Sequence, residues 1–403
     1  MPGSKSITNR ALVCAALARG ETLLANASDS DDSALMIAAL DQLGVLARRA
    51  ERGLIVRGSE GRLFAPRYPI RVGNAGTTLR FLLSLAALAQ GTTVLEGSER
   101  MASRPNDDLL EALRAQGVSL RQTPGSARYE VEGTGLRGGE LRVHAEKSSQ
   151  FLSSLLLVAP YAKDDMRIMV DGSLASETYV GMTCGIMERF GVEVHGSAGE
   201  GYHVTAGRRY TSCTMAVEAD ASSASYPLAA AAITGGEIFV EGFSLPSLQG
   251  DAAIADILRR MGCVVEEHSG GMTARGPAVL RGIDLDMNRV PDLVPTVVSM
   301  ALFAEGSTRI RNVAHLRFKE SDRLAALAEE LRRLGARIEV TSDGLEVHPA
   351  ALHGAQLDPH DDHRLAMSFA VIGLMVAGVA VENPDCVRKS YPEFWTEFHA
   401  MYS

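Results

Sequence analysis

This chain of 403 residues has fewer positively charged than negatively charged side chains. Lys and Arg together number 40 against 49 Asp and Glu, so the formal net charge is −9. A protein that binds nucleic acid needs a basic face, and this balance argues against one. An anionic ligand would therefore have to be held by a local cluster of cations rather than by the field of the whole molecule.

Cysteine and long apolar runs are also scarce. The most apolar run starts at Leu365 and includes Ser368 and two glycines, so it is too short for a membrane span and we expect a buried helix that runs into a strand. We expect no secretory or transit peptide before the first motif. The cysteines are dispersed without C-x-x-C spacing, which favours reduced thiols in a cytoplasmic protein. They are Cys14, Cys184, Cys213, Cys263 and Cys386.

What the chain does contain is a long internal repeat. Five glycines each follow an amphipathic stretch and precede a β-rich one, at intervals of 73, 74, 71 and 73 residues. These are Gly44, Gly117, Gly191, Gly262 and Gly335. A glycine in this place is the usual signal for the C-terminal cap of a helix. A period this long exceeds that of solenoid repeats and is typical of a compact unit that is used several times.

The order of elements inside one unit predicts the fold class. A short strand leads into a helix opened by Ser, Asn or Asp, and a strand, a second helix and two more strands follow. We predict an α/β (α+β) fold with two similar globular domains of three βαβαββ repeats each, residues 5–218 and 219–403, with residues 1–4 at the crossing between them. Lead-in strands such as PIRV and ELRV precede five helices, whereas only Met1 and Pro2 precede the first.

The N-terminal ends of the predicted helices are candidate anion sites, because they offer free N–H groups and the positive end of the helix dipole. GSKS opens the first helix, but no P-loop motif is present and a simple capped helix explains it equally well. GNAGTTLR has two glycines that let backbone approach a ligand, with Arg80 one turn later. The loop ERMASRP offers Arg100 and Arg104, and KSSQ opens another helix. Each has a plain alternative as a cap, a turn or a solvated charge.

Three later motifs concentrate charge. RFKESDR places Arg317, Lys319 and Arg323 among carboxylates, and its plain alternative is a solvated helix start with Lys319 and Arg323 on one face. DPHDDHR mixes histidine with aspartate, but its spacing matches no recognised ligand set, so we expect no metal. VRKSYPEF places Lys389 in a turn before a terminal helix. Because these motifs recur at equivalent places in the repeats, we expect them to form a shared anion-binding site.

Six of these motifs, in this order and over nearly the whole chain, closely resemble the 5-enolpyruvylshikimate-3-phosphate (EPSP) synthase family. They are PGSKSITNRAL, GNAGTTLRF, DASSASY, FKESDRL, DDHRLAM and the Lys389 turn. The resemblance implies the enolpyruvyl transferase fold, which is like an inverse α/β barrel and whose two domains close over the substrates. It implies transfer of the enolpyruvyl group of phosphoenolpyruvate to the 5-hydroxyl of shikimate 3-phosphate, with release of phosphate, in aromatic amino acid biosynthesis. It further implies a cytoplasmic monomer with two small-molecule substrates, no cofactor, and no nucleic-acid or membrane partner.

The resemblance also implies the roles of individual residues. Asp292 corresponds to the proton acceptor, Glu320 to a proton donor, and Lys5 to a residue that contacts both substrates. The implied ligands of shikimate 3-phosphate are Lys5, Ser6, Arg10, Ser148, Ser149, Gln150, Ser176, Asp292, His315 and Lys319. The implied ligands of phosphoenolpyruvate are Lys5, Gly76, Arg104, Gln150, Arg323, Arg364 and Lys389.

Two positions depart from the pattern of this family. His315 stands where many members have Asn beside the substrate. Phe81 follows Arg80 where several members have Pro. We hypothesise that Phe81 alters the helix that carries Gly76 and Thr77, and thereby the balance between phosphoenolpyruvate and the inhibitor glyphosate.

Two alternative functions remain to be distinguished. A UDP-N-acetylglucosamine enolpyruvyl transferase carries a reactive cysteine in a mobile loop of its first domain, and the loop from Arg100 to Asn106 has none. The motif KESDR also favours the shikimate substrate. A non-catalytic protein that binds phosphorylated ligands on the same fold would not need the intact set that this chain carries. Ligand binding without turnover would identify it.

Overall fold

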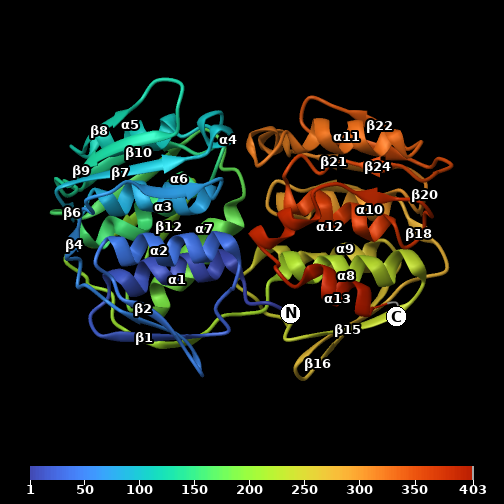
Figure 1. The fold of residues 1–403 in the computed structure, drawn as a ribbon, viewed down its shortest axis with the longest axis horizontal. Helices are drawn as coiled ribbons and strands as arrows, with labels where there is room; N and C mark the ends of the chain where they lie inside the picture. Colours follow the sequence, from blue (N-terminus) through green and yellow to red (C-terminus); the bar gives the residue numbers. More distant parts are fainter. Residues whose placement is uncertain (402–403) are drawn as a thin grey trace. The chain divides into compact units, whose positions relative to one another are not determined.

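The computed structural model describes residues 1–401, and the chain divides into two compact units. Gly3–Val217 forms one, called the N-terminal unit here, and Met1–Pro2 with Glu218–Ser403 forms the other, the C-terminal unit. Figure 1 shows the N-terminal unit from blue to green and the C-terminal unit from yellow-green to red. Each unit mixes helices with small sheets, so the predicted α/β class with two domains is confirmed.

The N-terminal unit contains three four-stranded sheets whose strands are arranged in the same way. Their strand orders are β14-β1-β3-β2, β5-β7-β9-β8 and β10-β11-β13-β12, and a two-stranded sheet pairs β4 with β6. The helices are α1 (Lys5–Leu17), α2 (Asp31–Gln42), α3 (Gly76–Ala86), α4 (Glu99–Ala102), α5 (Asp107–Ala115), α6 (Gln150–Val158), α7 (Glu177–Arg189) and the 3-10 turn η1 (Ala159–Tyr161). The strands are β1 (Glu21–Ala25), β2 (Ala47–Ala50), β3 (Gly53–Arg57), β4 (Leu63–Phe64), β5 (Ile70–Gly73), β6 (Ala89–Gln90), β7 (Thr92–Gly97), β8 (Ser119–Gln122), β9 (Arg128–Glu132), β10 (Gly139–His144), β11 (Met166–Asp171), β12 (His195–Ser197), β13 (Gly201–Val204) and β14 (Thr214–Ala216).

The C-terminal unit repeats the theme with sheets β15-β17-β16 and β19-β21-β23-β22 and the pairs β18-β20 and β24-β25. Its helices are α8 (Ala221–Thr234), α9 (Ile254–Arg260), α10 (Val294–Ala301), α11 (Arg323–Arg333), α12 (His363–Ile372) and α13 (Phe394–Ala400), with 3-10 turns η2 (Gly250–Ala253), η3 (Pro291–Leu293), η4 (Ala314–Phe318) and η5 (Pro384–Lys389). Its strands are β15 (Glu237–Glu241), β16 (Val264–His268), β17 (Gly271–Arg275), β18 (Leu280–Arg281), β19 (Asp284–Asp286), β20 (Ala304–Glu305), β21 (Thr308–Arg311), β22 (Arg337–Val340), β23 (Leu345–His348), β24 (Gln356–Leu357) and β25 (Ala380–Val381).

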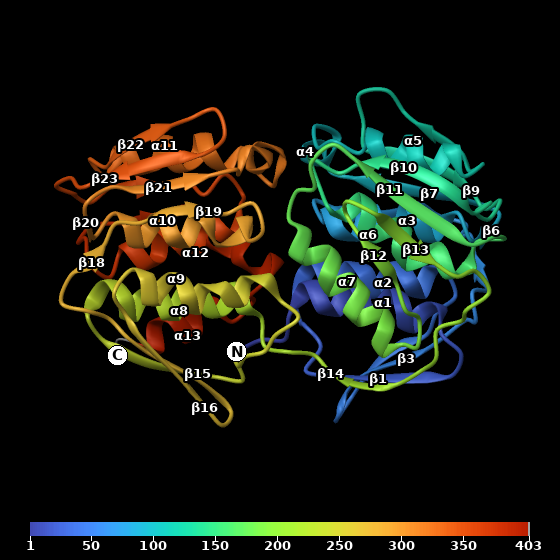
Figure 2. The same ribbon diagram turned by 180° about the vertical axis from the view of Figure 1, so that it is seen from behind.

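The lead strands β5, β10, β19 and β24 each pair in parallel with a strand that follows the first helix of the same repeat, whereas β14, which leads into α8, pairs in parallel with β1. Figure 2 shows β10 and β11 side by side, and their register pairs Leu141 with Ile168. A parallel pair requires a crossover, and the helix between the two strands supplies it. The last two strands of each repeat pair antiparallel, as β8 and β9 do. The polar residues that open α3, α6, α8, α10 and α12 therefore follow the end of a lead strand.

The glycines that define the repeat end helices, as predicted. Gly44 after α2 and Gly335 after α11 have φ angles of 90° and 88°, in the left-handed region that side chains disfavour. Gly117, Gly191 and Gly262 are likewise left-handed. Each cap fixes where the second helix of a repeat stops and the following strand begins.

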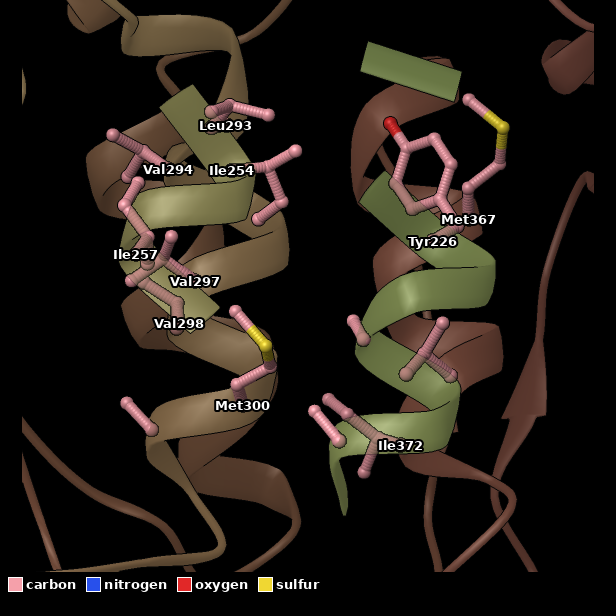
Figure 3. Packing of buried hydrophobic residues seen from close by; sticks show 14 of the residues in the cluster. Tyr226, Ile254, Ile257, Leu293, Val294, Val297, Val298, Met300, Met367 and Ile372 are labelled. Carbon is pink, nitrogen blue, oxygen red and sulfur yellow. The ribbon is translucent and has the colours of Figure 1, made fainter. Parts of the chain in front are cut away.

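The first helices of the repeats form the core of each unit. In the C-terminal unit α8, α10 and α12 pack on one another, and their side chains are buried almost throughout. Figure 3 shows Tyr226 of α8 beside Met367 of α12. The run from Leu365 forms α12 and is followed by β25, which confirms the predicted buried helix and strand. In residues 1–401, no helix has the length and apolarity needed to cross a membrane.

Candidate active site

At the start of α1 a buried lysine is paired with a buried aspartate. Lys5 Nζ lies 3.1 Å from Asp32 Oδ2, and Asp32 comes from the first turn of α2. The side chain of Ser4 caps the helix by accepting from the backbone N–H of Ile7. GSKS is therefore a capped helix start, but its cation lies inside the protein rather than in solvent. Ser6 follows Lys5 in the same first turn.

Arg10, one turn further along α1, is 1% exposed and lies between two aromatic rings. Its guanidinium carbon lies 5.4 Å from the centre of the Phe81 ring and 5.8 Å from that of Tyr179. Its Nε donates to Thr183 Oγ1 at 2.8 Å, and Nη1 donates to the backbone oxygen of Ser6 at 2.9 Å. Burial lowers the pKa of Arg10 to about 10, which leaves it charged at neutral pH. Arg10 therefore fixes the first turn of α1 and presents a positive charge beneath it.

Arg80 of α3 ties the start of α6 to a neighbouring loop. Its Nη1 donates to Gln150 Oε1 at 2.7 Å and to Ser148 Oγ at 3.2 Å, and its Nε donates to Asn106 Oδ1 at 2.9 Å. The guanidinium also stacks over the Phe151 ring at 5.0 Å. Two predicted substrate ligands, Ser148 and Gln150, are thus positioned by one buried arginine that lies on another helix.

Gly76 and Arg104 are brought together at the start of α3. A Cβ atom on Gly76 would lie 2.6 Å from Arg104 Nη2, so the guanidinium occupies the space that any side chain would need. Arg104 is buried and donates to the backbone oxygen of Asn74 at 3.2 Å. The interpretation of Arg104 as a solvated surface charge is therefore wrong.

Ser149 and Ser176 both occupy the residue before a helix. Ser149 precedes α6 and Ser176 precedes α7, and neither side chain makes a capping hydrogen bond. Ser176 has a φ angle of 56°, a left-handed conformation that costs free energy in a non-glycine residue. Both side chains are buried. With Lys5, Ser6, Arg10, Ser148 and Gln150, they complete the predicted shikimate-phosphate ligands that lie in the N-terminal unit.

In the C-terminal unit, Asp292 of η3 lies between two arginines. Arg323 Nη1 is 2.9 Å from Asp292 Oδ1, and Arg364 Nη2 is 2.7 Å from Asp292 Oδ2. Burial alone would raise the pKa of Asp292, but Arg364, Arg323 and Lys319 hold it well below its usual range. The structure thus joins the predicted proton acceptor directly to two predicted phosphoenolpyruvate ligands.

Arg323 contacts three carboxylates and is 1% exposed. Besides Asp292, its Nη2 is 2.8 Å from Glu320 Oε2 and its Nε is 2.7 Å from Asp362 Oδ2. Burial would lower the pKa of Arg323, but Asp362, Glu320 and Asp292 together raise it above its ordinary value. The alternative of a solvated helix start is wrong, because α11 begins at Arg323 itself while Lys319 lies before it in extended backbone.

Asp362 organises both arginines although it is fully buried. Its Oδ1 accepts from the backbone N–H of Arg364 at 3.0 Å and caps α12, while its Oδ2 also accepts from Ser321 Oγ at 3.2 Å. One carboxylate therefore neutralises Arg323 and fixes the helix start that carries Arg364.

Two more predicted residues, His315 and Lys389, and one that was not predicted, Asp251, also lie in the C-terminal unit. His315 lies in η4, and burial, followed by the charge of Lys319, lowers its pKa to about 3, so the ring is neutral at physiological pH. Lys389 ends η5, which precedes α13, as the sequence predicted. Asp251 of η2 accepts a hydrogen bond from Ser222, and burial followed by the charge of Asp292 raises its pKa to about 6.

The chemistry available to these residues is anion binding and proton transfer. Guanidinium and ammonium groups suit carboxylate and phosphate ligands, and buried carboxylates among cations suit acid–base work. Among residues 1–401, no cluster of three His, Cys, Asp or Glu side chains has the arrangement to hold a metal ion.

Comparison with known proteins decides the family. The model of the family described as EPSP synthase (3-phosphoshikimate 1-carboxyvinyltransferase) matches residues 1–398. The chain belongs to the EPSP synthase family. Proteins named 3-phosphoshikimate 1-carboxyvinyltransferase are 42% identical over 405 residues in a Nostoc species and 44% identical over 408 residues in Shewanella halifaxensis, with 100% of this chain and 95% and 96% of those proteins covered. A solved EPSP synthase from Acinetobacter baumannii superposes with a TM-score of 0.81 at 25% identity, covering 99% of this chain and 94% of that one.

Within this EPSP synthase family member, the predicted site residues form two separate groups. The N-terminal unit holds Lys5, Ser6, Arg10, Gly76, Arg104, Ser148, Ser149, Gln150 and Ser176. The C-terminal unit holds Asp292, His315, Lys319, Glu320, Arg323, Arg364 and Lys389.

Sequence reasoning did not assign a role to Asp32, Arg80, Asp251 or Asp362. Arg80 lies in the motif GNAGTTLR and Asp362 in DDHRLAM, whereas Asp32 and Asp251 lie outside the motifs. Their partners, however, come from segments 26 to 70 residues away. The signal that could have found them is the helix-capping position: Asp362 directly precedes α12, and Asp32 lies in the first turn of α2.

Proposed function

We propose that this chain is a 3-phosphoshikimate 1-carboxyvinyltransferase. In this role it transfers the enolpyruvyl group of phosphoenolpyruvate to the 5-hydroxyl of shikimate 3-phosphate and releases phosphate. The observation that carries the proposal is the cluster around Asp292, where a buried carboxylate contacts two arginines suited to hold an anionic substrate. Membership of the EPSP synthase family over residues 1–398 supports the same reaction.

Each of the two groups of residues contributes to the binding of both substrates. Lys5, Arg10 and the serines before α6 and α7 offer cations, hydroxyls and helix N-termini to the phosphate and carboxylate of shikimate 3-phosphate. Asp292, His315 and Lys319 are proposed to complete that site. Phosphoenolpyruvate is assigned to Lys5, Gly76, Arg104, Gln150, Arg323, Arg364 and Lys389, which together offer the planar forks and point charges that a doubly anionic substrate needs.

The reaction needs one base and one acid, followed by loss of phosphate. The 5-hydroxyl loses its proton to Asp292 as its oxygen bonds to C2 of phosphoenolpyruvate, and the methylene carbon gains a proton from an acid, for which we propose Glu320. In the second stage the Glu320 carboxylate takes a proton back from the methyl group as the C=C bond re-forms and the C–O bond to phosphate breaks, and the phosphate leaves with the proton held by Asp292. The surrounding arginines and lysines stabilise the departing phosphate.

The first experiment is an assay of phosphate release with shikimate 3-phosphate and phosphoenolpyruvate, each alone as a control. Release only when both are present is the expected result. Asp292→Asn should reduce kcat by about 10²- to 10⁴-fold, the usual contribution of a general base. Asp284→Asn, a change of an exposed aspartate in β19, should leave kcat unchanged. Release without shikimate 3-phosphate, or none from folded protein, would contradict the proposal.

The same assay separates the alternatives. A UDP-N-acetylglucosamine enolpyruvyl transferase would release phosphate only with the amino-sugar nucleotide as acceptor. A non-catalytic binding protein would show a ligand-dependent rise in Tm and no phosphate. The monomeric state and the cytoplasmic location stay predictions, and light scattering of the purified protein tests the first of them.

A further inference from the structure

Asp292 has a guanidinium on each of its carboxylate oxygens, at 2.9 Å from Arg323 and 2.7 Å from Arg364. A general base needs a lone pair that faces the hydroxyl it deprotonates and a pKa near the working pH. A carboxylate held at both oxygens, with its pKa pushed well below the usual range, is a weak base. Departure of one of the two arginines would free a lone pair on one oxygen of Asp292 and make the carboxylate a stronger base.

The two arginines are anchored differently. Arg323 is held by Glu320 and Asp362 in addition to Asp292, so its movement would break two more buried ion pairs. Arg364 reaches the opposite oxygen of Asp292 from the start of α12, and its movement leaves those pairs of Arg323 intact. Arg364 also depresses the pKa of Asp292 more than Arg323 does, and its charge lowers the pKa of Asp251 as well. Movement of Arg364 thus changes the pKa of Asp292 most without breaking the other two ion pairs of Arg323.

Building on the function proposed above, we propose that Arg364 passes from Asp292 to the phosphoenolpyruvate anion and so releases the base. The substrate offers carboxylate and phosphate oxygens, which bind a guanidinium through two parallel N–H donors as well as Asp292 does. The freed Oδ2 then accepts the proton of the 5-hydroxyl as the O–H bond breaks and the new C–O bond forms. Arg323 keeps Oδ1 and holds the carboxylate in place. The base becomes active only when phosphoenolpyruvate is bound.

The test is the affinity for phosphoenolpyruvate alone, measured by titration calorimetry in a double-mutant cycle of Asp292→Asn and Arg364→Gln. Asp292→Asn removes the competitor for Arg364, so it should abolish turnover and yet bind phosphoenolpyruvate about tenfold more tightly, a coupling typical of contacting charged residues. In the Arg364→Gln background the same change should have no effect on the affinity. Equal or weaker binding by Asp292→Asn would overturn the proposal.

Glu320→Gln is the matched control, because it removes a negative charge beside Arg323 without releasing Arg364. If Glu320→Gln bound phosphoenolpyruvate tighter by the same factor, the loss of any nearby negative charge would explain the effect. That result would overturn the proposed transfer of Arg364. A crystal structure of the wild-type protein with phosphoenolpyruvate tests it without any variant: Arg364 should lie beyond 4 Å from Asp292 and Arg323 should stay. Turnover without these changes rejects the transfer alone, whereas absence of both binding and turnover rejects the proposed function.

Discussion

At the scale of single residues, the site depends on charges that are buried in pairs. Arg323 and Asp362 are both almost completely removed from water, and each is tolerable inside the protein only because the other is there. Leaving one partner of such a pair unmatched costs much more than a surface ion pair contributes. Residues proposed to bind substrate are thus also residues on which the stability of the C-terminal unit depends.

Asp362→Asn is expected to lower the free energy of unfolding by about 3 kcal/mol, because it leaves Arg323 with one fewer counter-charge in a buried place. Urea denaturation measures it. Asp358→Asn, four residues earlier and far more exposed, should stay within about 0.5 kcal/mol of the wild type. Equal stability of the two variants would show that Asp362 is not an essential partner of Arg323.

His315 makes a prediction about pH. Its pKa is about 3 in the folded protein, against about 6.5 in an unfolded chain, so between these values the unfolded state binds more protons. Folding stability contributed by this residue is therefore present above pH 6.5 and is lost as the pH falls towards 3. His315→Asn should remove this loss, by an amount of the order of 2 kcal/mol between pH 7 and pH 4.5. Parallel curves of stability against pH for the two proteins would contradict the burial of a neutral ring.

At the scale of elements, the helix starts that are proposed to bind substrate are tied to one another by side chains. Arg80 reaches from the second turn of α3 to the first residues of α6 and to the loop before α5. A helix N-terminus binds an anion well only when its N–H groups are fixed in direction. Arg80 is a positioning residue in this sense, acting through Ser148 and Gln150.

Arg80→Lys keeps the charge but loses the fork that bonds three partners at once. We expect the KM for shikimate 3-phosphate to rise about tenfold, with a smaller change in kcat, as when an interaction for binding is lost. Steady-state kinetics with each substrate varied in turn measures the difference. Arg114→Lys on the exposed face of α5 should behave as the wild type. An unchanged KM in Arg80→Lys would show that the contacts of Arg80 with Ser148 and Gln150 are not needed for substrate binding.

Phe81 belongs to the same helix and covers Arg10. Proline at this interior position of α3 would remove a backbone N–H and cost about 3 kcal/mol, so Phe81→Leu is the cleaner test of its proposed influence on inhibition. Loss of the ring should change the ratio of the glyphosate inhibition constant to the KM for phosphoenolpyruvate by about threefold, the size of a partly buried cation–π contact. An unchanged ratio, with helix content unchanged by circular dichroism, would reject the influence of Phe81.

At the scale of the whole molecule, the proposed reaction draws on residues from both units. Lys5 belongs to the N-terminal unit and Asp292 to the C-terminal unit. Because the repeats place polar helix starts in both units, each unit has its own cluster of buried charge. Binding of shikimate 3-phosphate should therefore raise Tm, and the rise should depend on the buried charges at the proposed site.

Shikimate 3-phosphate at about a hundred times its Kd should stabilise the protein by about 2.7 kcal/mol and raise Tm accordingly. Lys5→Met should abolish most of this rise, because it removes the buried cation at the start of α1. Lys163→Met, on the surface of the same unit, should keep it. Thermal unfolding followed by fluorescence or calorimetry gives the comparison. A full rise in Lys5→Met would remove Lys5 from the binding site.

The sequence by itself determined what depends on neighbours along the chain. The repeat of about 73 residues, the glycine caps at Gly44 and Gly335, the buried run from Leu365 and the turn at Lys389 could all be read from local patterns of polarity and backbone preference. These patterns arise within one or two turns, so they need no knowledge of the rest of the molecule. They also sufficed to name the candidate residues by resemblance.

Only the tertiary structure decided which charges meet and which of them lie inside. Arg323 and Asp362 are 39 residues apart, and Arg364 and Asp292 are 72 apart, so no local pattern distinguishes these pairs from solvated surface charges. Burial depends on how α10, α11 and α12 pack, and the pKa of Asp292 depends in turn on that burial and on the two guanidiniums. Long-range packing converts an ordinary set of charged residues into a site where one carboxylate is held by two competing cations.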